Sequence, residues 1–213
     1  MRRLLKYPKV IYDTNCIISY CFKTCLNTKT GRVVIDESPF TDTIRTITQF
    51  LIDKNKRVCT LEIAINEITR EGLAKAVARK ITDQSIRRSM GLREGEQFPE
   101  EIEWTILKNL TKKVRKFRYE IWFEIDNEFK TRPSNVKRLK TFFERLFIDS
   151  TIKSSFKSHK RPLPSFVDIS LILYSKHAVL PLVSNDAHIT EFRNELKAEG
   201  YTHEIFPLMA LAT

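Results

Sequence analysis

The sequence predicts an α/β protein: a central parallel sheet flanked by helices, with a long all-helical insertion. Short apolar runs typical of buried strands alternate with amphipathic, helix-type stretches at both ends of the chain. Between them, residues 82–161 show helical periodicity and carry much of the basic charge. We therefore expect a single domain, 1–213, with a basic helical insertion at 82–161.

The N-terminal part begins in the order β-α-β-α. Residues 9–12 form a short β-type run, and a helix is expected from Ser38-Pro39, where Ile44, Ile47, Phe50 and Leu51 recur at helical spacing. A second strand is expected at 56–60 and a second helix at 61–81. This alternation favours a parallel sheet.

The insertion begins after a loop at 89–99. Pro99 with the two following acids is typical of a helix start, and we expect that helix to continue to Phe129. Residues 132–135 read as a break, 136–156 as a further helix, and 157–164 as a basic connection.

Regular α/β order resumes at Ser165. The expected elements are a helix from there to Ala178, a strand at 180–184, a helix at 187–199 and a closing strand at 202–206.

The charge of the chain is strongly positive and local. The net charge is +11, and residues 70–161 hold 23 of the 37 Lys and Arg residues against 13 of the 26 Asp and Glu residues. A local excess favours a surface that binds a polyanion such as nucleic acid. The residues expected to contact RNA are Lys137, Arg138, Lys140, Lys153, Lys157, His159, Lys160 and Arg161. A solvated basic helix face is the alternative interpretation.

Other features narrow the class. No apolar run approaches the roughly 20 residues that span a bilayer, and the N-terminus lacks the apolar segment of a secretory signal, so we expect a cytoplasmic protein without membrane contact. Cys16, Cys21 and Cys25 lack the spacing of zinc-binding pairs. With Cys59 they are interpreted as reduced, mostly buried thiols.

Four acidic residues stand where carboxylates are costly: Asp13, Glu67, Asp168 and Asp186. Asp13 and Asp186 follow predicted strands, and the carboxyl ends of parallel strands meet at one edge of a sheet. Each acid also has an ordinary explanation, as a helix cap for the three aspartates and as a surface salt-bridging residue for Glu67. Four carboxylates at one edge would repel one another unless cations lay between them, which predicts a metal site.

The ordered set of motifs resembles PIN-domain nucleases, a family that includes toxins of the VapC type. The motifs are Val-Ile-Tyr-Asp13-Thr-Asn15, the helical Glu67, Phe-Val-Asp168-Ile-Ser-Leu-Ile-Leu and Leu-Val-Ser184-Asn-Asp186. Together they cover roughly residues 8–81 and 162–207. The insertion is far longer than in compact PIN toxins. Minimal protein-only ribonuclease P carries a helical insertion in a comparable place, but begins with Asp-Thr-Ser where this chain has Asp-Thr-Asn.

The resemblance implies an endoribonuclease that hydrolyses RNA phosphodiester bonds with Mg²⁺ or Mn²⁺. It assigns Asp13, Glu67, Asp168 and Asp186 to the metal and catalytic site, with Asn15 and Ser184 orienting those carboxylates. A toxin would have an antitoxin-like protein partner, and the long amphipathic helices would allow a homodimer. The alternative is a catalytically inactive RNA-binding or scaffold protein with the same fold.

Overall fold

A parallel five-stranded sheet forms the centre of the protein. The structure is a computed structural model, and it describes residues 1–21, 25–27, 32–34, 39–68, 93, 108, 111–148 and 163–211. The strand order is β5-β4-β1-β6-β7, and every neighbouring pair is parallel. The strands are β1 (Lys9–Tyr12), β4 (Arg57–Leu61), β5 (Phe123–Asp126), β6 (Pro181–Ser184) and β7 (Glu204–Pro207). The predicted α/β class with a parallel sheet is confirmed.

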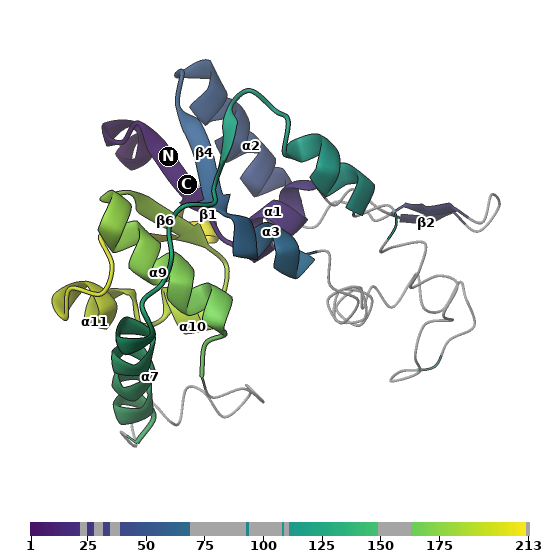
Figure 1. Cartoon of the computed structure of the whole chain (residues 1–213). Helices are drawn as coiled ribbons and strands as arrows, with labels where there is room; N and C mark the ends of the chain where they lie inside the picture. The colour runs from purple at the N-terminus through teal and green to yellow at the C-terminus, as the bar shows by residue number, and fades with distance from the viewer. Residues whose placement is uncertain are drawn as a thin grey trace.

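The two faces of the sheet are each covered by helices, which explains why its strands are apolar on both sides. Successive residues of β1 alternate between two core clusters: Val10 and Tyr12 lie in one and Ile11 in the other. The first cluster includes residues of α1 (Thr14–Cys21), α2 (Pro39–Asp53) and the helical residues 111–117. The second includes residues of α7 (Pro133–Ile148), α9 (Phe166–Ala178) and α11 (Arg193–Ala198), which lie together in Figure 1.

Strand β1 is at the middle of the sheet, where the chain order reverses. It pairs with β4 on one side and with β6 on the other, in the registers Val10–Val58 and Ile11–Leu182. The carboxyl ends of β1 and β6 are therefore neighbours although the strands are far apart in the sequence. In open α/β sheets such a position is where ligands bind.

The expectation of one continuous helix up to Phe129 is wrong. The helical residues 111–117 end at a turn, and the chain then forms β5, which pairs with β4 at the edge of the sheet. Trp122 and Phe123 pack with Phe117 and hold this turn against the core. Glu124 adds ion pairs to Lys9 and Arg57. Segment 82–161 is thus not all-helical: Phe117 lies in a helix, but Phe123 begins a strand.

Several element boundaries differ from those predicted. The expected break at 132–135 contains the start of α7, since Pro133 is tolerated in a first helical turn, where its missing N–H has no partner to lose. The helix expected at 187–199 is divided into α10 (Ala187–Thr190) and α11. A short antiparallel pair, β2 (Cys25–Asn27) and β3 (Arg32–Val34), was not predicted.

The other predicted helices and strands agree with the structure where it describes them. The helix expected at 61–81 is described as α3 (Glu62–Ile68), and its continuation lies outside the described residues. The same holds for most of the loop at 89–99, for the end of the helix beyond Ile148, and for most of the connection at 157–164. Short 3₁₀ helices, η1 (Arg2–Lys6) and η2 (Leu208–Leu211), contribute Leu4 and Leu211 to one core cluster.

Cys16, Cys21 and Cys59, the cysteines whose side chains the structure describes, are free, buried thiols. Burial raises the pKa of the Cys21 and Cys59 thiols to about 12, so both are neutral at physiological pH. The prediction of reduced, buried thiols is confirmed for these three. Within the described ranges, no helix is both long enough and apolar enough to cross a membrane.

Candidate active site at the carboxyl edge of the sheet

Asp13 follows β1 directly and is almost completely buried, with 1% of its surface exposed. One carboxylate oxygen accepts a hydrogen bond from the backbone N–H of Cys16 at 2.6 Å, which makes Asp13 the N-cap of α1. The other accepts a hydrogen bond from the hydroxyl of Ser184. Asp13 is therefore both a helix cap, as its ordinary explanation requires, and part of a contact between β1 and the end of β6.

Ser184 connects two of the predicted acids. While its hydroxyl donates to Asp13, its oxygen accepts the backbone N–H of Asp186 at 2.9 Å. Asp186 begins α10, because its carbonyl accepts the N–H groups of Ile189 and Thr190. This fully buried serine thus sets the position of the Asp13 carboxylate and of the Asp186 backbone together.

Asp168 lies in the first turn of α9 and forms a capping box with Ser165. Its carboxylate accepts the Ser165 N–H at 2.8 Å, and its own N–H bonds to the Ser165 hydroxyl at 3.1 Å. The predicted cap is confirmed. Since α9 precedes β6 and runs antiparallel to it, this first turn lies towards the carboxyl edge, where Asp13 and Asp186 are found.

Burial and neighbouring negative charge raise the pKa values of Asp13 and Asp168. Burial raises the pKa of Asp168 to about 6, and the charges of Asp186 and Asp13 add to that effect. Burial likewise raises the pKa of Asp13, with a smaller contribution from the charge of Asp186. The hydrogen bonds from Ser165, Ser184 and Cys16 oppose these shifts but do not overcome them. Three acids therefore share an environment that disfavours three negative charges.

Glu67 is tied to the same group through Thr14. The Thr14 hydroxyl donates to a carboxylate oxygen of Glu67 at 2.7 Å, and Thr14 is the residue after Asp13. Glu67 is half-buried on α3, which contacts both α1 and α9. The alternative role of Glu67 was a surface salt bridge, and Arg70, three residues further along the chain, lies outside the described residues.

Thr14 is the positioning residue that the sequence interpretation did not single out. Asn15, which was expected to orient a carboxylate, is half-buried on α1, and no hydrogen bond from its side chain is found in the described part of the chain. The adjacent threonine makes that type of contact instead. In the sequence, the only indication of this role for Thr14 was its position directly after Asp13.

The donor set fits a hard divalent cation in its chemistry. Asp13, Asp168 and Asp186 supply carboxylate oxygens, the ligand type that Mg²⁺ and Mn²⁺ prefer, and a cation would relieve their repulsion. Among the described residues, no three Asp, Glu, His or Cys side chains form a closed group able to hold a metal. The three aspartates are thus within electrostatic reach of one another without forming a finished coordination shell.

The basic residues expected to contact RNA are only partly described. Lys137, Arg138 and Lys140 are exposed on α7, whose opposite side packs against α9 through Leu139 and Phe143. The other five lie outside the described residues: Lys153, Lys157, His159, Lys160 and Arg161. Phe142 and Phe143 are buried, which agrees with a packing role rather than base stacking.

Comparison of the chain with protein-family models, with curated proteins and with solved structures gave no match.

Proposed function

We propose that this chain is a Mg²⁺- or Mn²⁺-dependent endoribonuclease with a PIN-like site at the carboxyl edge of its sheet. The observation that carries the proposal is the crowding of Asp13 and Asp168 with Asp186: burial and the negative charge of Asp186 raise the pKa values of the Asp13 and Asp168 carboxyls. Clustered carboxylates with raised pKa values are typical of functional sites. A site built only to cap three helices has no need to bring the three charges together.

The proposed roles follow from the contacts of each residue. Asp13, Asp168 and Asp186 would hold the cation, and Glu67 would bind it directly or through water. A divalent ion held by these carboxylates would lower the pKa of a bound water and would stabilise charge on the leaving oxygen. Ser184 fixes the Asp13 carboxylate, and Thr14 fixes that of Glu67. Both hydroxyls therefore restrict the directions in which the acids present their oxygens.

The proposed substrate is RNA because of the local positive charge. Lys137, Arg138 and Lys140 are exposed on α7, which packs beside the helix that carries Asp168. Cations on this helix would bind backbone phosphates and leave sequence preference to other contacts. Whether the role is that of a toxin with an antitoxin-like partner or of an RNA-processing enzyme follows from the substrate.

One observation favours a second candidate, a catalytically inactive RNA-binding protein. The described residues contain no closed group of three metal ligands. A protein that had lost turnover could keep the buried aspartates as helix caps and retain its basic surface.

The deciding experiment is cleavage of a mixed RNA pool with Mn²⁺ or Mg²⁺ by the wild type and by Asp186→Asn. We expect metal-dependent cutting that is lost in the variant, while the variant keeps its fold. Asp42→Asn is the matched control, since Asp42 is an exposed first-turn aspartate of α2. RNA that is bound tightly but left intact by the wild type would reject the nuclease in favour of the second candidate.

A further inference from the structure

A cavity of about 640 Å³ lies on the outer side of α9, away from the acidic group. It is bounded by the connection between β5 and α7, the first turns of α7, the second half of α9 and the turn after α11. Its lining includes Lys176, eight residues after Asp168, which is about 12 Å further along the helix axis. The cavity is therefore separate from the proposed catalytic site.

The connection that forms one wall of the cavity is held by specific contacts. The Asp126 carboxylate accepts the backbone N–H groups of Glu128 and Phe129, both at 2.9 Å. The Thr131 hydroxyl bonds to the Ser170 hydroxyl on α9 at 2.9 Å. The Phe129 ring packs against His177, with centroids 5.2 Å apart. This wall is thus shaped before any ligand binds.

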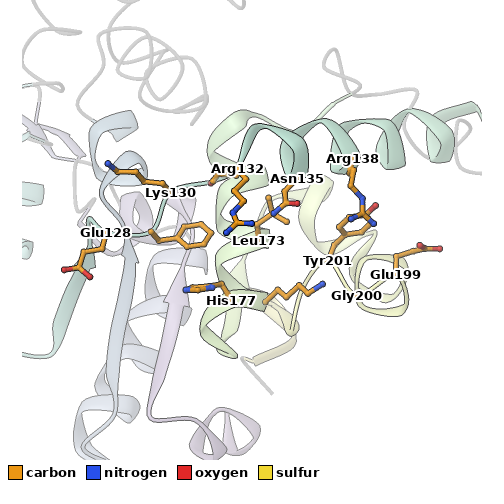
Figure 2. A pocket seen from close by; sticks show the side chains of 13 residues that line it. Glu128, Lys130, Arg132, Asn135, Arg138, Leu173, His177, Glu199, Gly200 and Tyr201 are labelled. Carbon is orange, nitrogen blue, oxygen red and sulfur yellow. The ribbon is translucent and has the colours of Figure 1, made fainter.

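Four cations line the cavity, and they come from three different segments. They are Lys130, Arg132, Arg138 and Lys176. Within the described part of the chain, no ion pair or hydrogen bond engages any of these four charged groups. Figure 2 shows Arg132 and Asn135 side by side over Leu173, with Arg138 one turn further along α7 than Asn135.

One further feature adds positive potential, and a glycine shapes the opposite wall. The cavity lies at the N-terminus of the 16-residue helix α7, which carries a partial positive charge from the helix dipole. Gly200 in the turn after α11 has φ of +67°, a conformation that favours glycine, and it lies beside the Lys176 ammonium. A cation near the end of α9 is also explained by the helix dipole. That explanation does not reach Lys130, Arg132 or Arg138.

The cavity is larger than a phosphate needs, and part of its lining is aromatic. Phe129, His177 and Tyr201 contribute rings, and Tyr201 is fixed by packing on Phe142 at 5.0 Å. Carboxylates of Glu128 and Glu199 are also present. Carboxylates oppose a bare anion but accept hydrogen bonds from sugar hydroxyls or base amino groups. The volume falls within the range of ordinary small-ligand sites.

We propose that this cavity binds a nucleoside phosphate, with its phosphate on Arg132 and Lys176 and its sugar or base against the aromatic lining. This nucleoside phosphate is either a free nucleotide or one nucleotide within an RNA strand. The inference goes beyond the proposed nuclease, because binding requires neither the acidic group nor a divalent metal.

The test measures binding of adenosine 5′-monophosphate, adenosine and a five-nucleotide RNA by calorimetry without divalent metal. We expect the monophosphate to bind and the double variant Arg132→Gln/Lys176→Gln to weaken it at least about tenfold. Lys54→Gln, an exposed lysine at the end of α2, is the control and should bind as the wild type does. Binding of the RNA alone, with the same loss in the double variant, would identify a strand as the source.

Several results would overturn the proposal. They are the absence of saturable binding of both phosphate ligands, equal affinity for adenosine and its monophosphate, or a double variant that binds like the wild type. Melting curves establish that the variants fold, and Arg138→Gln gives a second, independent test of the lining. Asp186→Asn should bind the monophosphate normally, so failure of the nuclease and failure of this site are distinguishable.

Discussion

Asp168→Asn should stabilise the metal-free protein at pH 7, although it alters a helix cap. The pKa of Asp168 is raised to about 6 from an ordinary value of 3.8, mainly by burial and then by the charge of Asp186. A difference of about two pKa units corresponds to about 3 kcal/mol, the free energy by which ionised Asp168 destabilises the folded state at neutral pH. Asparagine removes that charge and keeps an oxygen that can accept the Ser165 N–H.

The net gain should be smaller than this figure. Losing a negative charge from the first turn of a helix costs about 0.3–1 kcal/mol, and a neutral acceptor forms a weaker hydrogen bond than a carboxylate does. We therefore expect a net stabilisation of about 1–2 kcal/mol. For a chain of this size, that is a rise in melting temperature of roughly 3–6 °C.

The pH dependence gives a stricter test than the sign alone. Above about pH 6 the carboxyl is ionised in both folded and unfolded wild type, so the full destabilisation is present. As pH falls from 6 towards 3.8, the folded state takes up the proton first and the destabilisation is lost. The stability gap between variant and wild type should therefore shrink between pH 7 and pH 5.

The assay is thermal or denaturant unfolding of both proteins from pH 5 to pH 8 in the presence of a chelator. Asp42→Asn is the control, because Asp42 is an exposed first-turn acid whose loss should be neutral or slightly destabilising. The reasoning is refuted if Asp168→Asn is less stable than wild type at pH 7. It is also refuted if the gap does not change with pH.

Three further predictions concern other residues described above. Ser184→Ala should lower the free energy of unfolding by about 1–3 kcal/mol, because the Asp13 carboxylate and the Asp186 N–H both lose a hydrogen-bond partner. Denaturant titration tests this beside Ser134→Ala, a control at an exposed serine. Equal stability of the two variants would contradict the prediction. Thr14→Val should leave the melting temperature within a few degrees of the wild type. It should reduce metal-dependent cleavage about 10- to 100-fold, because Glu67 loses its hydroxyl donor. Unchanged cleavage in an active enzyme would exclude a positioning role for Thr14. At most one of the four cysteines should react with a thiol reagent before unfolding, because burial protects Cys16, Cys21 and Cys59 and raises their pKa values. Two fast-reacting thiols in the native protein would contradict the burial of these three side chains.

Strong local periodicity explains what the sequence predicted well. Strands β1 and β6 are continuous apolar runs, as parallel strands covered on both faces should be. Ile44, Ile47 and Leu51 recur at helical spacing and are fully buried on α2. In these elements the pattern of burial can be read from the chain itself.

The missed features depend on contacts between distant segments. Phe123 follows Trp122 in an aromatic run that suits a helix face as well as a strand, and the choice is made by pairing with β4. The cavity beside α9 could not be predicted, since its lining comes from four separate segments. The proximity of three aspartates was expected from the order of the strands. One positioning residue differs from the prediction: Asn15 was expected to orient a carboxylate, and the hydroxyl of Thr14 contacts Glu67 instead.

The hydrogen bond between Asp13 and Ser184 has a consequence for synthesis of the protein. These residues are 171 positions apart, so the ribosome makes the acid long before it makes the serine that orients it. Strand β1 also has β6 as a neighbour only after that point. A nascent chain, or one truncated before residue 184, therefore has Asp13 without the group that orients it. If the proposed activity is correct, a nascent chain lacks it until synthesis has passed residue 184 and β6 has paired with β1.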